Sequence, residues 1–145
     1  MIFRKAKKKD YLFIKKIAVK AYKKYIPRIG QEPAPMRPTF EKNDVIFVCE
    51  KNSKIVAFAI IVTLGKKKLL NNIAVDPIFQ QKKIGTYFIH YIEKYFKRKK
   101  VYLYELYTNE KMIENIRWYQ KLGFKKFKKI TEKGFKRVYF RKKIN

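Results

Sequence analysis

The segment Asn72–Thr86 combines residue types that can hold an anion. A run of apolar residues predicts a buried strand that ends at Val75, a short loop follows, and a helical pattern begins near Lys83. The first amide N–H groups of a helix have no partner within it and carry the positive end of its dipole, so they can bind phosphate. Lys82 and Lys83 add positive charge at this point. The alternative is an ordinary strand–loop–helix connection with two solvated lysines.

A second segment of chemical interest runs from Leu106 to Phe124. It contains the end of a strand and a short predicted helix, Met112–Leu122, followed by Gly123, a residue that suits the position after a helix end. Asn115 and Tyr119 lie one helical turn apart in it. The phenol of Tyr119 is a competent proton donor. The alternatives are that Tyr119 only packs the helix and that Asn115 is a surface residue.

Together the two segments resemble the fingerprint of the GNAT superfamily, the acyl-CoA-dependent N-acyltransferases. That fingerprint has a strand ending in an apolar–Ala–Val type triplet, then Gln/Arg-x-x-Gly-x-Gly/Ala opening a helix, then a strand–Thr–Asn–Tyr–Leu–Gly–Phe segment. The matching stretches here are Ile73-Ala74-Val75, Gln80-Gln81-Lys82-Lys83-Ile84-Gly85 and Leu106–Phe124. The resemblance extends over Val45–Val138. It implies an N-acetyltransferase that moves an acetyl group from acetyl-CoA to a primary amine of a small molecule or protein, with no metal.

The resemblance also implies where the cofactor binds. The strands Leu69–Val75 and Val101–Tyr107 would splay apart, with the pantetheine between them. Backbone groups at Ile73 and Val75 would hold the pantetheine amides, and the amide of Ile73 or Ala74 would polarise the acyl carbonyl as an oxyanion-hole donor does. The amides from Gln80 to Gly85 would hold the pyrophosphate. The implied cofactor-binding residues are Ile73, Ala74, Val75, Gln80, Gln81, Lys82, Lys83, Ile84, Gly85, Thr86, Asn115 and Tyr119.

Direct transfer to an amine needs a proton for the departing thiolate, whose free pKa is near ~8.5. By the same resemblance Tyr119 donates that proton, and Asn115 binds the pantetheine or the cofactor backbone. The base is left open, because some members carry a Glu at the position of Leu69 here. Asn72 is the candidate that orients a water to remove the amine proton; alternatively it ends a polar strand face. Glu105 is interpreted as an ion partner on the sheet surface.

Two positions near the implied site have alternative interpretations. The family usually has Gly where this chain has Lys83, and often where it has Gln81. Gly permits close backbone approach and unusual φ, so ordinary helical backbone at Lys83 would preserve the site and another conformation would weaken cofactor binding. The loop Gly30–Arg37 lies where these enzymes build the acceptor pocket. There Glu32 is a candidate for meeting an amine and Arg37 for meeting a carboxylate, unless the loop is only a proline-stiffened connection.

The hydrophobic patterns predict the elements that must position these residues. Strands are expected at Ile2–Arg4, Val45–Glu50, Ile55–Leu64, Leu69–Val75, Val101–Tyr107, Lys125–Ile130 and Arg137–Arg141. Helices are expected from the N-cap Asp10 to Pro27, over Lys83–Phe96 and over Met112–Leu122. The order β-α-β-β-β-α-β-α-β-β predicts an α/β fold with a mixed, mostly antiparallel sheet of about seven strands flanked by helices. We expect residues 1–145 to form a single GNAT-like domain.

The charge of +27 has two interpretations. Only seven of the 38 basic residues are Arg, the residue that supplies bidentate recognition, and the abundant Lys, Ile, Phe, Tyr and Asn are those that A/T-rich codons encode. Compositional drift therefore explains the excess as well as a polyanion partner does. Ten basic residues lie between Lys125 and Lys143, so nonspecific polyanion contact is expected. The competing function is a GNAT-like fold with weakened CoA binding that acts as a basic polyanion- or nucleic-acid-binding module.

Length and composition set the remaining expectations. A chain of 145 residues suits one domain, and 47% hydrophobic content excludes intrinsic disorder. No apolar run approaches the ~20 residues of a membrane helix and no signal peptide is recognisable, so we expect a cytoplasmic protein without a membrane partner. The lone Cys49 excludes an internal disulfide and a multi-thiolate metal site. A homodimer is among the assemblies we consider.

Overall fold

The computed structural model of the chain describes residues 1–80 and 82–145 with their side chains. Its strands are β1 (Ile2–Lys5), β2 (Val45–Lys51), β3 (Lys54–Leu64), β4 (Lys67–Val75), β5 (Leu103–Asn109), β6 (Lys125–Glu132) and β7 (Phe135–Lys143). Its α-helices are α1 (Tyr11–Tyr22), α2 (Ile26–Ile29), α3 (Ile84–Arg98) and α4 (Ile113–Lys121). Short 3₁₀ helices lie at Lys8–Asp10, Lys23–Tyr25, Ala34–Met36 and Pro77–Lys82. The expected order of strands and helices is confirmed, with α2 and the 3₁₀ helices added.

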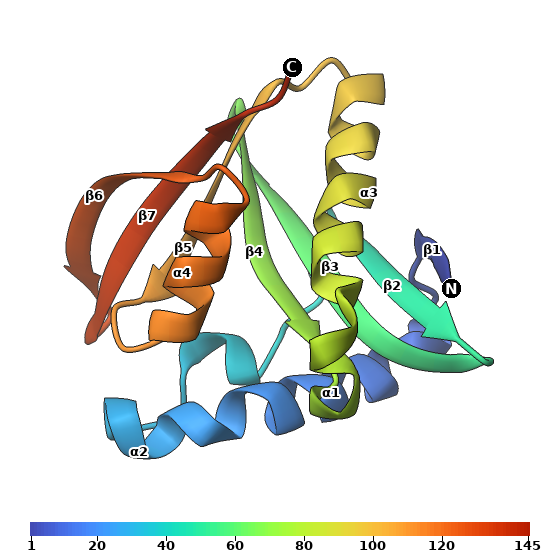
Figure 1. Ribbon diagram of the computed structural model, residues 1–145, viewed down its shortest axis with the longest axis horizontal. Helices are drawn as coiled ribbons and strands as arrows, with labels where there is room; N and C mark the ends of the chain where they lie inside the picture. The colour runs from blue at the N-terminus through green and yellow to red at the C-terminus, as the bar shows by residue number, and fades with distance from the viewer.

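The strands form a seven-stranded mixed sheet in the order β1-β2-β3-β4-β5-β7-β6. Neighbouring strands are antiparallel except β4 and β5, which are parallel. That parallel pair is in register at Leu69 and Glu105. Beyond this point the two strands diverge, and Figure 1 shows them as the arms of a V whose open end faces α1 and α2. The predicted α/β fold class is confirmed.

Helices pack on both faces of the sheet. On one face α3 turns Phe88, Ile92 and Phe96 inward at a spacing of four residues, and all three are fully buried. Tyr119 and Leu122 of the α4 segment join the same apolar cluster. On the other face the buried residues of α1 pack against β2, β3 and β4. The open end of the V therefore lies between two helical layers.

The first helix begins where predicted, with Asp10 at the N-cap position, but the side chain of Asp10 and the end of the helical path differ from the prediction. Asp10 does not cap α1, because its carboxylate turns back to accept the backbone N–H of Lys7 at 2.7 Å and to pair with Arg4 at 2.8 Å. Pro27 does not end the helical path either. It lies in the first turn of α2, where its missing N–H costs nothing, and the path ends at Gly30 with φ of 86°.

The fifth strand begins two residues later than predicted. Val101 lies in the turn that closes the end of α3, because its N–H donates to the carbonyl of Phe96 at 2.9 Å after Lys100 takes a left-handed conformation. Its apolar side chain packs on the core from that position, which explains why the sequence pattern counts it as strand. The β2–β3 and β6–β7 hairpins have turns at Asn52-Ser53 and Lys133-Gly134, and all four turn residues have positive φ, as tight hairpins require.

Among the described residues, no helix is both long enough and apolar enough to cross a membrane.

Candidate active site

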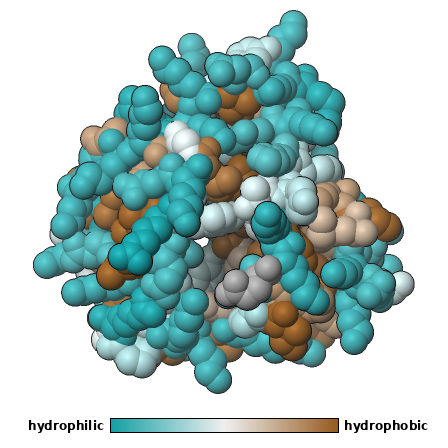
Figure 2. Space-filling view, in the orientation of Figure 1, coloured by the Kyte–Doolittle hydropathy of each residue, from teal (hydrophilic) through white to brown (hydrophobic). Residues whose placement is uncertain are grey.

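The opening between β4 and β5 leads into a cavity of 370 Å³. Its walls come from α1, β4, the loop before α3, the first turn of α3, and α4. Figure 2 shows a hollow near the centre of this face, where Figure 1 has the opening of the V. Eight of the sequence-predicted cofactor residues line it together: Ile73, Ala74, Val75, Gln80, Lys83, Gly85, Thr86 and Asn115. The structure thus brings most of the predicted site to one place.

One end of this cavity is the start of α3. No side chain of the described residues caps this helix, so its first amide N–H groups are free to bind a ligand. Lys83 lies at the N-cap position of α3 and lines the cavity. Lys24, in the 3₁₀ helix that follows α1, lines the same cavity. Uncapped amides, the positive end of the helix dipole and two lysines make an anion site. These features fit the pyrophosphate of a CoA-type cofactor.

Three predicted residues of the loop contribute differently. Ile84 is buried in the core, so only its backbone can reach a ligand. Lys82 is exposed, and its Nζ lies 5.6 Å from the centre of the Phe79 ring. The side chain of Gln81 lies outside the described part of the structure.

Lys83 does not have helical backbone geometry. Its φ of 59° and ψ of 15° are left-handed, the conformation that Gly adopts without a Cβ clash. The sequence alternative of ordinary helical geometry is therefore wrong. The backbone here follows the path that a Gly would take, at a cost of about 1 kcal/mol for a residue with a side chain. The weaker cofactor binding expected for a non-helical Lys83 therefore stays a prediction, which CoA titration of the Lys83 variants tests.

This geometry predicts a difference between two substitutions of Lys83. Lys83→Gly removes the left-handed strain and should raise the free energy of unfolding by about 1 kcal/mol, whereas Lys83→Ala keeps the strain and should not. Thermal melts of the two variants measure this difference. Both variants lose the ammonium group, so calorimetric titration with CoA separates its role. Equal loss of affinity in both variants would show that the ammonium contacts phosphate; affinity at or above the parent level in Lys83→Gly would assign the phosphate to the backbone amides.

The edge of β4 that faces the cavity carries two carbonyls with side-chain partners. The hydroxyl of Tyr22 lies 3.0 Å from the carbonyl oxygen of Ile73, and Nε2 of Gln80 donates to the carbonyl of Val75 at 3.1 Å. Asp76 fixes the turn between them and α3 by accepting the N–H of Ile78 at 3.1 Å. A carbonyl oxygen has two lone pairs, so both positions can still accept a hydrogen bond from an amide.

A smaller cavity of 30 Å³ adjoins the first one deeper in the V. Tyr22, Ile73 and Asn115 line both cavities, and Tyr119 lines the smaller one. The ring of Tyr119 is buried against Phe124, with ring centres 5.6 Å apart. Within the described residues its hydroxyl makes no hydrogen bond, yet it is not a buried unsatisfied group. Tyr119 therefore lines the smaller cavity with a hydroxyl that has no protein partner among the described residues.

Burial raises the pKa of Tyr119 above its ordinary value of 10.0, with a smaller contribution from nearby Tyr25. The phenol therefore stays protonated through neutral pH and is in the form that can donate a proton. Burial likewise raises the pKa of Tyr22, so that it acts as a neutral hydrogen-bond donor toward β4.

Asn72 and Asn115 lie beside Tyr119 on either side of the smaller cavity. Asn72 is buried. Its Oδ1 accepts from the Tyr22 hydroxyl at 2.8 Å, and its Nδ2 donates to the carbonyl of Pro35 at 3.0 Å. These bonds tie β4 to α1 and to the loop after α2. Among the described residues, the second N–H of the Asn72 amide has no protein partner. Asn115 lies closer to the surface, where its Nδ2 contacts the sulfur of Met112 at 3.6 Å.

An ion pair joins α2 to α4 at the mouth of the larger cavity. The two terminal nitrogens of Arg28, Nη1 and Nη2, donate to Glu114 at 2.6 and 2.9 Å, and Nζ of Lys24 lies 3.8 Å from the same carboxylate. The Arg28 guanidinium lowers the pKa of Glu114 to about 2. The pair is half exposed, so it contributes little to the stability of the fold. It links α2 to α4 beside the larger cavity.

The acceptor side was predicted to lie at the loop Gly30–Arg37. The middle of that loop does line the smaller cavity, through Pro33, Ala34 and Pro35. Glu32 and Arg37 instead pair with each other at 2.9 Å in an exposed position. Their carboxylate and guanidinium are each already engaged, so the structure gives neither a free role toward a ligand.

A third cavity, of 440 Å³, continues from the small one across the sheet face, because Asn71, Tyr107 and Arg137 line both. Glu105 lies in its wall, as a sheet-surface residue, with three further carboxylates from Glu41, Asp44 and Glu132. Within the described residues, no group of His, Cys, Asp and Glu is arranged to bind a metal ion.

Sequence reasoning missed two residues of the site. The sequence pattern gives Tyr22 only a packing position in the first helix, although its hydroxyl reaches β4 between the two cavities. It gives Trp118 only an exposed position beside Tyr119, although Trp118 lines the larger cavity. The missing signal for Tyr22 is three-dimensional, because only the crossing of α1 over β4 brings the two together. For Trp118 a signal existed, since it is the single Trp of the chain and lies within the matched motif.

Comparison with known families and structures agrees with this geometry. The model of the acetyltransferase (GNAT) domain matches residues 42–126, more than half of the chain. No curated protein matches the sequence. PaiA N-acetyltransferase of Thermoplasma acidophilum, solved in complex with coenzyme A, is 17% identical with a TM-score of 0.79, and the match covers 98% of both chains.

Two further solved structures share the fold over nearly the whole chain. The ribosomal-protein-S18-alanine N-acetyltransferase of Escherichia coli is 18% identical with a TM-score of 0.77, and the match covers 99% of this chain and 94% of that one. A GNAT family acetyltransferase of Elizabethkingia anophelis with acetyl-CoA bound is 15% identical with a TM-score of 0.70, covering 99% and 97%. With the family model, the splayed strands and the uncapped helix start in agreement, this chain belongs to the GNAT family of acetyltransferases and is an acyltransferase.

Proposed function

We propose that residues 1–145 form one cytoplasmic N-acetyltransferase domain that moves an acetyl group from acetyl-CoA to a primary amine by direct transfer. The observation that carries this proposal is the arrangement along the V between β4 and β5. An uncapped helix start lies at one end, and the hydroxyl of Tyr119 lies at the other. The first feature suits the phosphates of the donor and the second suits its sulfur.

The proposed reaction uses groups of this chain in three places. Acetyl-CoA supplies the thioester. The amide N–H of Ile73 or Ala74 polarises its carbonyl, and the amine nitrogen attacks the carbonyl carbon. The carbon–sulfur bond breaks, and the Tyr119 hydroxyl gives its proton to the departing thiolate. The proton lost by the amine passes to water, which the free N–H of Asn72 holds near the acceptor side; solvent restores the Tyr119 proton.

The 440 Å³ cavity supports an amine acceptor on the opposite side from the donor. It shares Tyr107 and Arg137 with the reaction pocket, and Glu41, Asp44 and Glu105 lie in its walls. Amines carry positive charge in solution, and most of the surface of this chain repels them. The four carboxylates of this cavity face four basic residues, Lys67, Lys128, Lys133 and Arg137, so the cavity is close to neutral and repels a cationic amine less than the rest of this strongly positive chain does.

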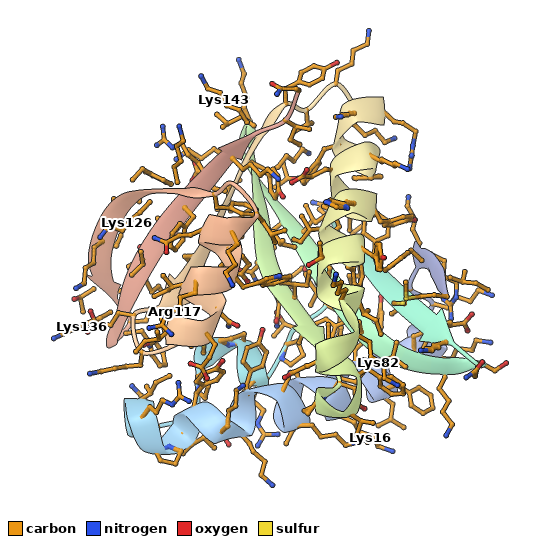
Figure 3. All side chains as sticks on the ribbon, in the orientation of Figure 1. Lys16, Lys82, Arg117, Lys126, Lys136 and Lys143 are labelled. Carbon is orange, nitrogen blue, oxygen red and sulfur yellow. The ribbon has the colours of Figure 1, made fainter. Side chains whose placement is uncertain are left out.

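The polyanion-binding alternative has less structural support. The labelled basic residues of Figure 3 come from different elements: Lys16 from α1, Lys82 from the loop before α3, Arg117 from α4, and Lys126, Lys136 and Lys143 from the β6–β7 hairpin. These six side chains point outward in different directions, and three of them lie on the β6–β7 hairpin. Such a spread favours weak, salt-sensitive contact with any polyanion over a defined nucleic-acid interface.

An activity screen tests the proposed function. The chain is incubated with acetyl-CoA and a panel of monoamines, polyamines and peptides with free N-termini. Thiol release is followed with a thiol-reactive dye, and each product is weighed by mass spectrometry. The proposal expects thiol release that depends on the amine, with one acetyl group added to it. Thiol release that is the same without any amine, and no acetylated product, would contradict it.

A further inference from the structure

The indole of Trp118 occupies the space that a side chain at Gly85 would need. A Cβ placed on Gly85 would lie 2.9 Å from Cζ2 of Trp118 and 3.2 Å from its Cη2, closer than the usual carbon–carbon contact of about 3.5–4.0 Å. The indole Nε1 also donates to Oγ1 of Thr86 at 3.4 Å. The indole of Trp118, which projects from α4, therefore packs directly against the first turn of α3.

This contact lies within the larger cavity. Trp118 lines the cavity together with Gly85, Thr86 and the β4 residues Ile73 and Val75. The same hypothetical Cβ would lie 3.7 Å from Cγ2 of Val75, so the ring, the helix start and the strand converge at Gly85. A ligand whose phosphates bind the start of α3, and whose chain runs along β4, must pass this ring.

We propose that Trp118 is a cofactor-contacting residue whose indole forms the apolar wall for the pantetheine arm, and that Gly85 lacks a side chain in order to seat that ring. This inference rests on the proposed function. The pantetheine arm carries a branched dimethyl group and methylenes, and burying such groups on an aromatic ring is favourable. In this chain Gly85 leaves the space that the Trp118 indole occupies. The left-handed backbone of Lys83 positions the amides that would bind the phosphates.

The intrinsic tryptophan fluorescence of the native chain tests whether the Trp118 indole contacts the pantetheine arm. Trp118 is its single Trp, so its emission reports this site alone. The chain is titrated with CoA and with adenosine 3′,5′-bisphosphate, which has phosphates but no pantetheine, while binding of each is followed separately by thermal shift. We expect CoA to change the emission saturably, and adenosine bisphosphate to change it little at equal occupancy. CoA that stabilises the fold without changing the emission would overturn the inference and leave the proposed function intact. Failure of CoA to bind at all would remove both.

A double-mutant cycle tests whether Gly85 acts through its contact with Trp118. Gly85→Ala should weaken CoA binding about tenfold, because the new methyl group displaces the indole. Trp118→Leu should weaken binding about fivefold through loss of the aromatic wall. In the Trp118→Leu background, Gly85→Ala should cost less than about twofold, because nothing remains to be displaced.

The cycle has its own contradicting result. If Gly85→Ala reduces CoA affinity by the same factor in both backgrounds, Gly85 acts on the phosphates directly. The proposal that Gly85 makes room for the Trp118 indole is then wrong. Gly85 has no left-handed φ, so Ala is compatible with its helical backbone, and circular dichroism checks that each variant is folded. Trp118→Phe, which keeps an aromatic wall, should recover most of the affinity that Trp118→Leu loses.

Discussion

Replacing Tyr119 by Phe should lower the turnover of amine acetylation by about 10²-fold or more, because general-acid catalysis typically contributes at least that factor. The ring stays in place against Phe124 and Phe140, so only the hydroxyl is lost. CoA affinity should stay within about twofold of the parent, since the phenol acts on the sulfur as it leaves. Steady-state kinetics with a saturating amine, and calorimetric CoA titration, measure the two quantities.

A matched substitution separates the chemistry from the general effect of losing a phenol. Tyr91 lies on α3, packs on Phe3 with ring centres 5.2 Å apart, and lines none of the three cavities around the V. Tyr91→Phe should leave turnover unchanged. The pH profile adds a second criterion. Because burial raises the pKa of Tyr119 above 10.0, the acid form persists and turnover should not fall on the alkaline side below that pH. Equal turnover in Tyr119→Phe and the parent across the pH range would remove Tyr119 from the mechanism.

The largest expected effect on stability belongs to Phe88, one turn after the start of α3. Phe88 is fully buried, and its ring packs on Phe3 with centres 5.0 Å apart. Phe88→Ala should lower the free energy of unfolding by about 3–5 kcal/mol, the usual cost of emptying an aromatic core site. For a chain of this length that corresponds to a fall in Tm of roughly 10 °C. Since Phe88 anchors the helix whose first amides form the anion site, CoA affinity should fall with it.

The neighbouring Tyr87 provides the control, because it lies on the same turn but is 51% exposed. Tyr87→Ala should cost less than about 1 kcal/mol. Chemical denaturation of both variants with a common m-value measures the difference. A similar loss for both would mean that the packing of α3 on the sheet does not hold the helix start in place, which would contradict the account of the anion site.

Much of the fold was predictable because its hydrophobic periodicities are simple. The inward spacing of Phe88, Ile92 and Phe96 identifies α3, and the apolar run of β3 identifies a central strand. The wrong predictions of a capping side chain and of a strand start occur where a local pattern competes with a specific hydrogen bond. Asp10 has the identity of a helix cap but pairs with Arg4, and Val101 has the identity of a strand residue but closes α3. Such competition is decided by tertiary contacts, which a local pattern does not contain.

Only the part of the candidate site that lies on one continuous segment of the chain could be predicted from the sequence. The strand–loop–helix from Ile73 to Thr86 is continuous in sequence, so its backbone role could be anticipated. The left-handed backbone of Lys83 could not, because Lys has no preference for that conformation. Tyr22 and Trp118 reach the site from α1 and α4, and their roles depend on how those helices cross β4 and α3.

The most direct test of the central claim, that acetyl-CoA binds in the V between β4 and β5, is a thermal-shift titration. The chain is heated with acetyl-CoA, ATP or polyphosphate at low and at moderate salt. A ligand at about 100 times its Kd stabilises a fold by about 2.7 kcal/mol, enough for a clear shift. We expect stabilisation by acetyl-CoA that exceeds that by ATP and persists in salt. Equal shifts from every polyanion that disappear as salt screens the +27 charge would contradict it.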